Sequence, residues 1–123
     1  MLVKEAMRKP CTIDKDMSLS EAAKIMSSRG IGSLVFVSKE KIEGIITERD
    51  LLKNFGKGGS VAKVMTRKVV TVDPDEELEE ALNLMKTNKV KRLPAVRDKK
   101  VVGMISLTDI AVHSDEIGES FFF

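Results

Sequence analysis

Apolar residues recur along the chain with helical and strand-like spacings, and the same series of spacings occurs twice. Two sets of four apolar residues have the i, i+3, i+4, i+7 spacing of a helix with one buried face: Leu19, Ala22, Ala23 and Met26, and then Leu78, Ala81, Leu82 and Met85. After each set, two β-rich runs flank a short polar turn, over residues 34–46 and again over 93–105, which predicts two β-hairpins. A short strand is expected before each long helix and a short helix after each hairpin.

The two series are copies of one another. The alignment of Asp14 with Asp73 also brings further identical pairs together: Leu19 with Leu78, Gly44 with Gly103, and Asp50 with Asp109. Each copy therefore predicts a β-α-β-β-α unit of the mixed α/β (α+β) class. Because a unit of roughly 50 residues buries little apolar surface alone, we expect the two copies to pack sheet to sheet about a pseudo-twofold axis.

The duplication also predicts the boundaries of the parts. We expect the first copy over residues 1–55, a glycine-rich linker over 56–60, the second copy over 61–114 and a tail over 115–123. A short lead segment opens each copy, since Val3-Lys-Glu-Ala-Met7 aligns with Val61-Ala-Lys-Val-Met65. The two methionines are predicted to pack in a core.

Composition and charge narrow the function. The 21 Lys and Arg residues exceed the 19 Asp and Glu residues by only two charges, so no global field favours nucleic acid or an anionic membrane. A single Cys and a single His exclude an internal disulfide and the usual histidine-rich metal cluster. The single Cys favours a reducing cytoplasm as the compartment. No apolar run approaches the roughly 18–20 residues that cross a bilayer, so no membrane association is expected. The charged fraction of 33% favours a thermophilic source.

One local pattern carries candidate chemistry in both copies. An apolar strand, a glycine, a hydroxyl residue and an aspartate occur in order, as Gly44-Ile-Ile-Thr47-Glu-Arg-Asp50 and as Gly103-Met-Ile-Ser106-Leu-Thr108-Asp109. At a strand-to-helix junction this pattern aims N–H groups and a hydroxyl at one point, which suits a phosphate. The aspartate can accept two hydrogen bonds from a vicinal diol such as ribose. The same Ser/Thr-x-x-Asp spacing also forms a capping box without any ligand, so both interpretations stay open.

The whole arrangement resembles a tandem pair of CBS (cystathionine β-synthase) domains, a Bateman module, here expected to stand alone. The residues that carry the resemblance are Thr12-Ile-Asp14, Gly32-Ser-Leu-Val35, Lys91-Arg-Leu-Pro94 and the two glycine-to-aspartate motifs. The resemblance implies an energy-sensing regulatory module, without enzymatic activity or an obligatory cofactor. Its ligand would be AMP, ADP, ATP or S-adenosylmethionine, bound in the cleft between the repeats.

The resemblance also implies roles for individual residues. Asp50 and Asp109 would hold ribose hydroxyls, Lys91 and Arg92 would meet phosphate, and hydroxyls would come from Thr47, Ser106 and Thr108. Adenine would lie near Thr12-Ile13, Thr71-Val72, Ile31 and Val90. Because uncharged Gly32-Ser33 aligns with Lys91-Arg92, we expect a stronger phosphate site in the second copy. Arg49 either compensates in the first copy or is a solvated helix residue.

Two other classes of function compete with a ligand sensor. The basic stretch over 86–100 could bind single-stranded nucleic acid or another polyanion, although no Trp or Tyr supplies a stacking surface. A purely structural oligomerisation module with empty pockets is the other alternative. A homodimer and an unidentified effector protein are the expected partners, and the three phenylalanines over 121–123 are predicted to be buried in the dimer.

Overall fold

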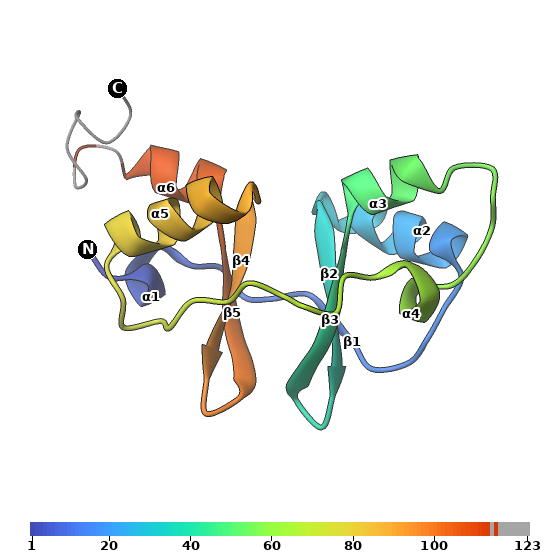
Figure 1. Ribbon diagram of the computed structural model, residues 1–123, viewed down its shortest axis with the longest axis horizontal. Coiled ribbons are helices and arrows are strands. Elements are labelled where there is room, and N and C mark those ends of the chain that lie inside the picture. Colours follow the sequence, from blue (N-terminus) through green and yellow to red (C-terminus); the bar gives the residue numbers. More distant parts are fainter. Residues whose placement is uncertain (114, 116–123) are drawn as a thin grey trace. The chain divides into compact units, whose positions relative to one another are not determined.

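The computed structural model describes residues 1–113 and 115, and its elements follow the order expected from the duplication except for the short strand expected before the second long helix (Figure 1). Six helices and five strands lie in this described part, which confirms the mixed α/β class: α1 (Val3–Ala6), β1 (Thr12–Ile13), α2 (Leu19–Arg29), β2 (Ser33–Ser38), β3 (Lys41–Thr47), α3 (Glu48–Lys53), α4 (Val61–Val64), α5 (Leu78–Asn88), β4 (Arg92–Arg97), β5 (Lys100–Ser106) and α6 (Leu107–Val112). The predicted burial of residues 121–123 falls outside the described residues. No described helix has the length and apolar character needed to cross a membrane.

The chain forms two compact units, one of which is discontinuous in sequence. The middle unit is Cys11–Val69, and the terminal unit combines Met1–Pro10 with the described residues from Val70 onward. Each lead segment therefore joins the unit built around the other copy. The expected boundaries at residues 55 and 61 follow the duplication in the sequence, whereas the compact units exchange their lead segments.

The middle unit is built on the predicted hairpin. Strands β2 and β3 pair antiparallel from Ser33 beside Thr47 to Ser38 beside Lys41, and β1 adds in parallel along β2. Helices α2 and α3 lie on the same side of this hairpin (Figure 1). A hydrophobic core joins α2, β2, β3 and α4 through Leu19, Ala22, Met26, Leu34, Ile46, Val61 and Met65.

The terminal unit repeats this plan with one difference. Strands β4 and β5 pair antiparallel from Arg92 beside Ser106 to Arg97 beside Lys100. The short strand predicted before α5 is reduced to a single parallel bridge between Val72 and Ala95. In the middle unit the Val35 N–H donates to the Cys11 carbonyl oxygen, but the aligned residue in β4 is Pro94, which has no N–H to donate.

The core of the terminal unit includes the first lead segment. Val3 of α1 is fully buried together with residues of α5, β4, β5 and α6. These partners are Val72, Leu78, Ala81, Leu82, Met85, Leu93, Ala95, Ile105 and Ile110. The first lead segment therefore forms part of the hydrophobic core of the terminal unit.

The glycine of each duplicated motif makes room for a lead-segment methionine. A Cβ atom at Gly44 would approach the Met65 sulfur to 2.6 Å and the Thr66 carbonyl oxygen to 2.9 Å. A Cβ atom at Gly103 would meet the Met7 side chain, including its Cγ at 2.9 Å. Met65 is buried in the core and Met7 packs against the core, which confirms the packing predicted for both methionines.

Candidate functional site

The two strand-to-helix junctions are held by equivalent backbone hydrogen bonds. Thr47 ends β3 and Ser106 ends β5, and each is followed at once by a short helix. The first helical N–H of α3, on Glu48, donates to the Gly32 carbonyl oxygen at 3.0 Å, and its counterpart on Leu107 donates to the Lys91 carbonyl oxygen at 2.8 Å. Each junction is thus held against the residue that precedes the hairpin.

Asp109 is the most enclosed ionisable side chain of the terminal junction. It is 6% exposed, and its Oδ2 atom accepts hydrogen bonds from the Ser106 N–H at 3.0 Å and the Ser106 hydroxyl at 2.8 Å. The Asp109 N–H donates back to the Ser106 hydroxyl oxygen at 3.1 Å, which completes a capping box. The other carboxylate oxygen, Oδ1, accepts from Arg8 Nε at 2.8 Å.

Asp50 has the same local arrangement with one partner fewer. Its Oδ2 atom accepts from the Thr47 N–H at 2.9 Å and from the Thr47 hydroxyl at 3.2 Å. Within residues 1–113 and 115, no hydrogen-bond donor is found for Asp50 Oδ1. The aspartate therefore accepts the N–H of the preceding capping residue at both junctions, and the reciprocal capping box is complete at the terminal one. These bonds use one carboxylate oxygen in each, so they do not exclude a ligand on the other oxygen.

The basic residues predicted to meet phosphate lie at the terminal junction. Arg92 is the strand partner of Ser106, and the Lys91 carbonyl oxygen accepts the first N–H of α6. The Lys91 side chain is exposed, whereas Arg92 is half-buried. The fold therefore brings the backbones of Lys91 and Arg92 beside Ser106 and the start of α6, although they lie far from them in sequence.

The remaining predicted positions of the terminal unit lie around this junction. Thr108 is exposed in the first turn of α6, and Val90 is half-buried with its N–H donating to the Met85 carbonyl oxygen. Val72 is buried beside β4 on the edge opposite β5, and Thr71 precedes it in a half-buried position. No described contact tests their predicted role next to adenine.

The middle unit places its predicted residues in the corresponding way. Thr12 is exposed in β1 beside Val35, and the half-buried Ile13 and Ile31 pack against the core of the unit. Arg49 is exposed in the first turn of α3. Both interpretations of Arg49 stay open.

Arg8 is a site residue that the sequence analysis missed. It lies in the lead segment, outside the glycine-to-aspartate motif, and forms a two-way backbone bridge with Met104 at 2.9 Å in each direction. Thr66 forms the same bridge with Ile45, also at 2.9 Å in each direction. The alignment of the two lead segments places Arg8 opposite Thr66, but no motif in the sequence links Arg8 to Asp109.

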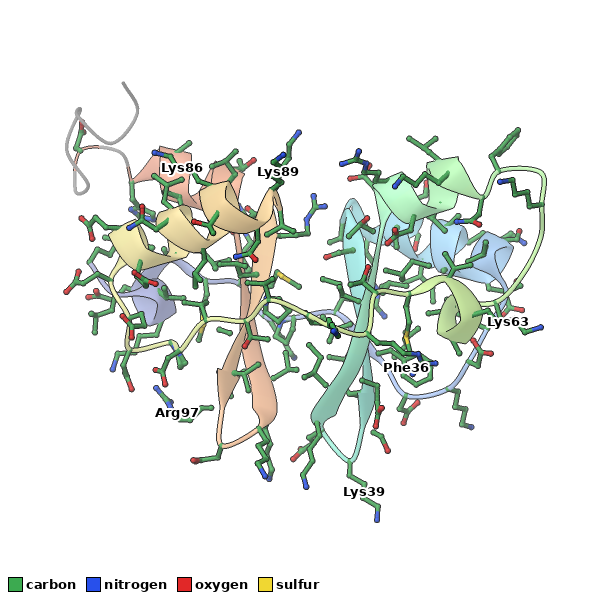
Figure 2. The ribbon with its side chains drawn as sticks, in the orientation of Figure 1. Phe36, Lys39, Lys63, Lys86, Lys89 and Arg97 are labelled. Carbon is green, nitrogen blue, oxygen red and sulfur yellow. The ribbon has the colours of Figure 1, made fainter. Side chains whose placement is uncertain are left out.

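The basic stretch over 86–100 is distributed over separate parts of the terminal unit. Figure 2 shows Lys86 and Lys89 at α5, whereas Arg97 lies toward the other end of the unit, near the turn of the β4–β5 hairpin. Arg97 donates to the Asp75 carboxylate at 3.2 Å, and Lys4 donates to it at 2.9 Å. The hydrogen bond from Lys4 and the two positive charges hold the pKa of Asp75 below its ordinary value.

Among residues 1–113 and 115, no group of three or more His, Cys, Asp or Glu side chains is placed to hold a metal ion. Cys11 is half-buried, and its sulfur accepts a contact from Arg29 Nη1 at 3.1 Å.

Comparison with known proteins gives matches over nearly the whole chain. The family model described as CBS domain matches residues 3–57 and again 61–116. Over 107 residues the chain is 31% identical to the CBS domain-containing protein YhcV of Bacillus subtilis, covering 83% of this chain and 76% of that protein. Over 101 residues it is 43% identical to inosine-5'-monophosphate dehydrogenase of Methanocaldococcus jannaschii, covering 80% of this chain. The chain spans only about a fifth of the length of the dehydrogenases that it matches.

A solved structure has the same fold. The CBS domain pair of protein MJ0100, in complex with 5'-methylthioadenosine and S-adenosyl-L-methionine, matches with a TM-score of 0.88 and 32% identity. The match covers 96% of this chain and 98% of that chain.

Proposed function

The chain belongs to the CBS domain family as a tandem pair, and from this premise we propose that it is a regulatory module that binds an adenosyl ligand. The ligand class is AMP, ADP, ATP or S-adenosylmethionine. The observation that carries the proposal is the duplicated junction, where a carboxylate is held by one oxygen while its second oxygen is not used for capping. The adenosyl compounds bound by the MJ0100 pair support the same ligand class.

The proposed recognition divides the ligand between two kinds of group. A carboxylate oxygen of Asp50 or Asp109 accepts hydrogen bonds from the ribose hydroxyls, which are neutral donors. In the terminal unit, the charges of Lys91 and Arg92 attract a phosphate, because charge-assisted hydrogen bonds to phosphate are strong. The Ser106 hydroxyl keeps its hydrogen bond to Asp109 at 2.8 Å. The terminal unit is therefore the stronger proposed phosphate site.

Binding of a ligand to the site is not enough for regulation. A ligand shifts a conformational equilibrium only as far as its affinities for the two states differ. We therefore expect an effector protein, or a further part of the same polypeptide, to bind one state preferentially.

Calorimetry with AMP, ATP and S-adenosylmethionine tests the proposal. We expect the wild-type chain to bind at least one of them, and Asp109→Asn or Asp50→Asn to weaken binding at its own site by about 10- to 100-fold, since hydrogen bonds to a charged group are lost. Asp98→Asn, in the turn of the β4–β5 hairpin, is the matched control and should bind like the wild type. If no adenosyl compound binds the wild type, the structural oligomerisation alternative takes its place.

The nucleic-acid alternative is separated from this proposal by salt. Binding of a polyanion to the basic residues over 86–100 would fall steeply as salt increases, because counterions are released. Binding of a small nucleotide should depend less on salt. The distribution of Lys86, Lys89 and Arg97 over different parts of the unit favours the small ligand (Figure 2).

A homodimer stays a prediction. Two exposed apolar side chains of the middle unit are available for it, Leu52 at 75% and Phe55 at 86% exposure. Sedimentation equilibrium of the wild type and of Leu52→Glu would measure the mass directly. A monomeric wild type would remove the dimer from the proposal without affecting the ligand.

A further inference from the structure

The carboxylate of the terminal junction already has a cationic partner. Arg8 Nε lies 2.8 Å from Asp109 Oδ1, and the Arg8 side chain is 76% exposed whereas the Asp109 side chain is 7% exposed. The guanidinium can therefore move into solvent without disturbing the core. The Asp109 carboxylate is enclosed in this arrangement, whereas the aligned Asp50, whose junction has Thr66 in the place of Arg8, is half-buried.

The middle unit shows that this ion pair is dispensable for the fold of the junction. Thr66 makes the same backbone bridge as Arg8, and Asp50 keeps the same two hydrogen bonds to its capping residue. No arginine is needed there to hold the aspartate. Arg8 therefore adds a property to the terminal junction beyond the shared architecture.

That property concerns how many hydrogen bonds the carboxylate can still accept. An ionised carboxylate has about four lone-pair sites. Ser106 uses two of those of Asp109, and Arg8 uses a third. A vicinal diol donates two hydrogen bonds, so it fits Asp109 fully only when Arg8 leaves, whereas Asp50 can accept both directly.

We propose that Arg8 makes the terminal junction selective for phosphorylated over uncharged adenosyl ligands, an inference that rests on the proposed function. A neutral nucleoside that displaces Arg8 leaves an enclosed carboxylate without its cation, which is costly. A nucleotide brings a phosphate to the same junction, so the guanidinium exchanges one anion for another. The diol then replaces Arg8 on Asp109.

The exchange predicts that the two junctions differ in selectivity. At the terminal junction, a phosphate compensates for the loss of the Arg8–Asp109 ion pair. At the middle junction, Thr66 offers no cation. The affinity for neutral adenosine should therefore be closer to the affinity for AMP there than at the terminal junction. Arg8 is a specificity residue that acts through its exchange between carboxylate and phosphate.

The experiment compares AMP with adenosine at the terminal junction. Binding is measured at constant ionic strength in the Asp50→Asn background, which weakens the middle site, with and without Arg8→Thr. We expect Arg8→Thr to weaken AMP by about 10-fold and to tighten adenosine by several-fold, as expected for loss of one charge-assisted contact to phosphate and removal of a competitor. Arg8→Lys, which keeps the charge, should retain most of the preference for AMP.

Two further variants complete the design. Arg97→Thr removes another exposed arginine of the same unit that is paired with Asp75, and it should leave both affinities unchanged. In the Asp109→Asn background, Thr66→Arg should raise the preference of the middle junction for AMP over adenosine. Arg8→Gln serves as a second neutral variant, and thermal melts establish that each protein is folded.

The outcomes separate the inference from the proposed function. If AMP binds but Arg8→Thr and Arg8→Gln change AMP and adenosine by the same factor or leave both unchanged, the selectivity role of Arg8 is wrong while the ligand class stands. If Asp50→Asn alone abolishes all binding, the terminal junction is not a site and the inference is overturned. If the wild type binds no adenosyl compound at all, the proposed function itself fails.

Discussion

The exchange of lead segments can be tested by shortening one buried valine side chain in each lead segment, Val3 in the first and Val61 in the second. The Val3 side chain is fully buried in the core of the terminal unit, far along the sequence from its partners in α5, β4 and β5. Val61, at the aligned position of the second lead segment, is also fully buried, but in the core of the middle unit. Val3→Ala and Val61→Ala therefore remove the same atoms from two different cores.

The expected cost follows from the atoms removed. Two methyl-sized groups leave a fully buried position, at about 0.8 kcal/mol each for transfer, and the cavity adds to this. We expect each variant to lose about 2 kcal/mol of unfolding free energy. With a urea m-value of about 2 kcal/mol/M for a domain of this size, the midpoint should fall by about 1 M.

Urea titration measures the loss, and native-state hydrogen exchange locates it. Val3→Ala should accelerate amide exchange mainly in residues 70–113, and Val61→Ala mainly in residues 11–69. The reasoning is refuted if Val3→Ala leaves the midpoint unchanged. It is also refuted if Val3→Ala accelerates exchange more in residues 11–69 than in the terminal unit, as expected if each lead segment packed on its own copy.

Two further predictions concern the motif glycines and acid stability. Gly44→Ala should destabilise by about 1–3 kcal/mol and more than Gly103→Ala, as measured by urea midpoints. The three atoms nearest to a Cβ at Gly44 include the Thr66 carbonyl oxygen, whereas the three nearest at Gly103 all belong to the flexible Met7 side chain. The backbone hydrogen bond from Ala62 holds the pKa of Asp16 below its ordinary value of 3.8. The ionised Asp16 carboxylate therefore stabilises the fold above pH 3.8, and this stabilisation is lost as the pH falls through the lowered pKa. In Asp16→Asn, the free energy of unfolding should depend less on pH over this acidic range. The same pH dependence in the variant and the wild type would contradict this assignment.

Much of the secondary structure was predictable because its signals are local. The four-residue apolar stripes set the faces of α2 and α5, and the polar turns between β-rich runs set both hairpins. The short strand before α5 was the exception. Pro94 was visible in the sequence, but a proline disrupts a strand pair only where the N–H at its position would be donated to the neighbouring strand. Only the pairing of β4 shows that Pro94 stands at such a position.

The candidate site was predictable in its motif and not in its surroundings. The spacing of Ser106 and Asp109 predicted both the junction and the capping hydrogen bonds, because these partners lie three residues apart. Arg8 lies 101 residues from Asp109 in the chain, and no periodicity or spacing relates the two.

The sequence by itself determined the duplication, the order of elements and the two carboxylates, since each depends on side-chain chemistry over a few neighbouring positions. The tertiary structure decided which unit receives each lead segment and therefore which carboxylate receives an arginine. The two lead segments have similar apolar patterns, with Val3 and Met7 aligned to Val61 and Met65, so either could fill either core on local grounds. The choice depends on the path of the whole chain, and that is a property of long-range packing.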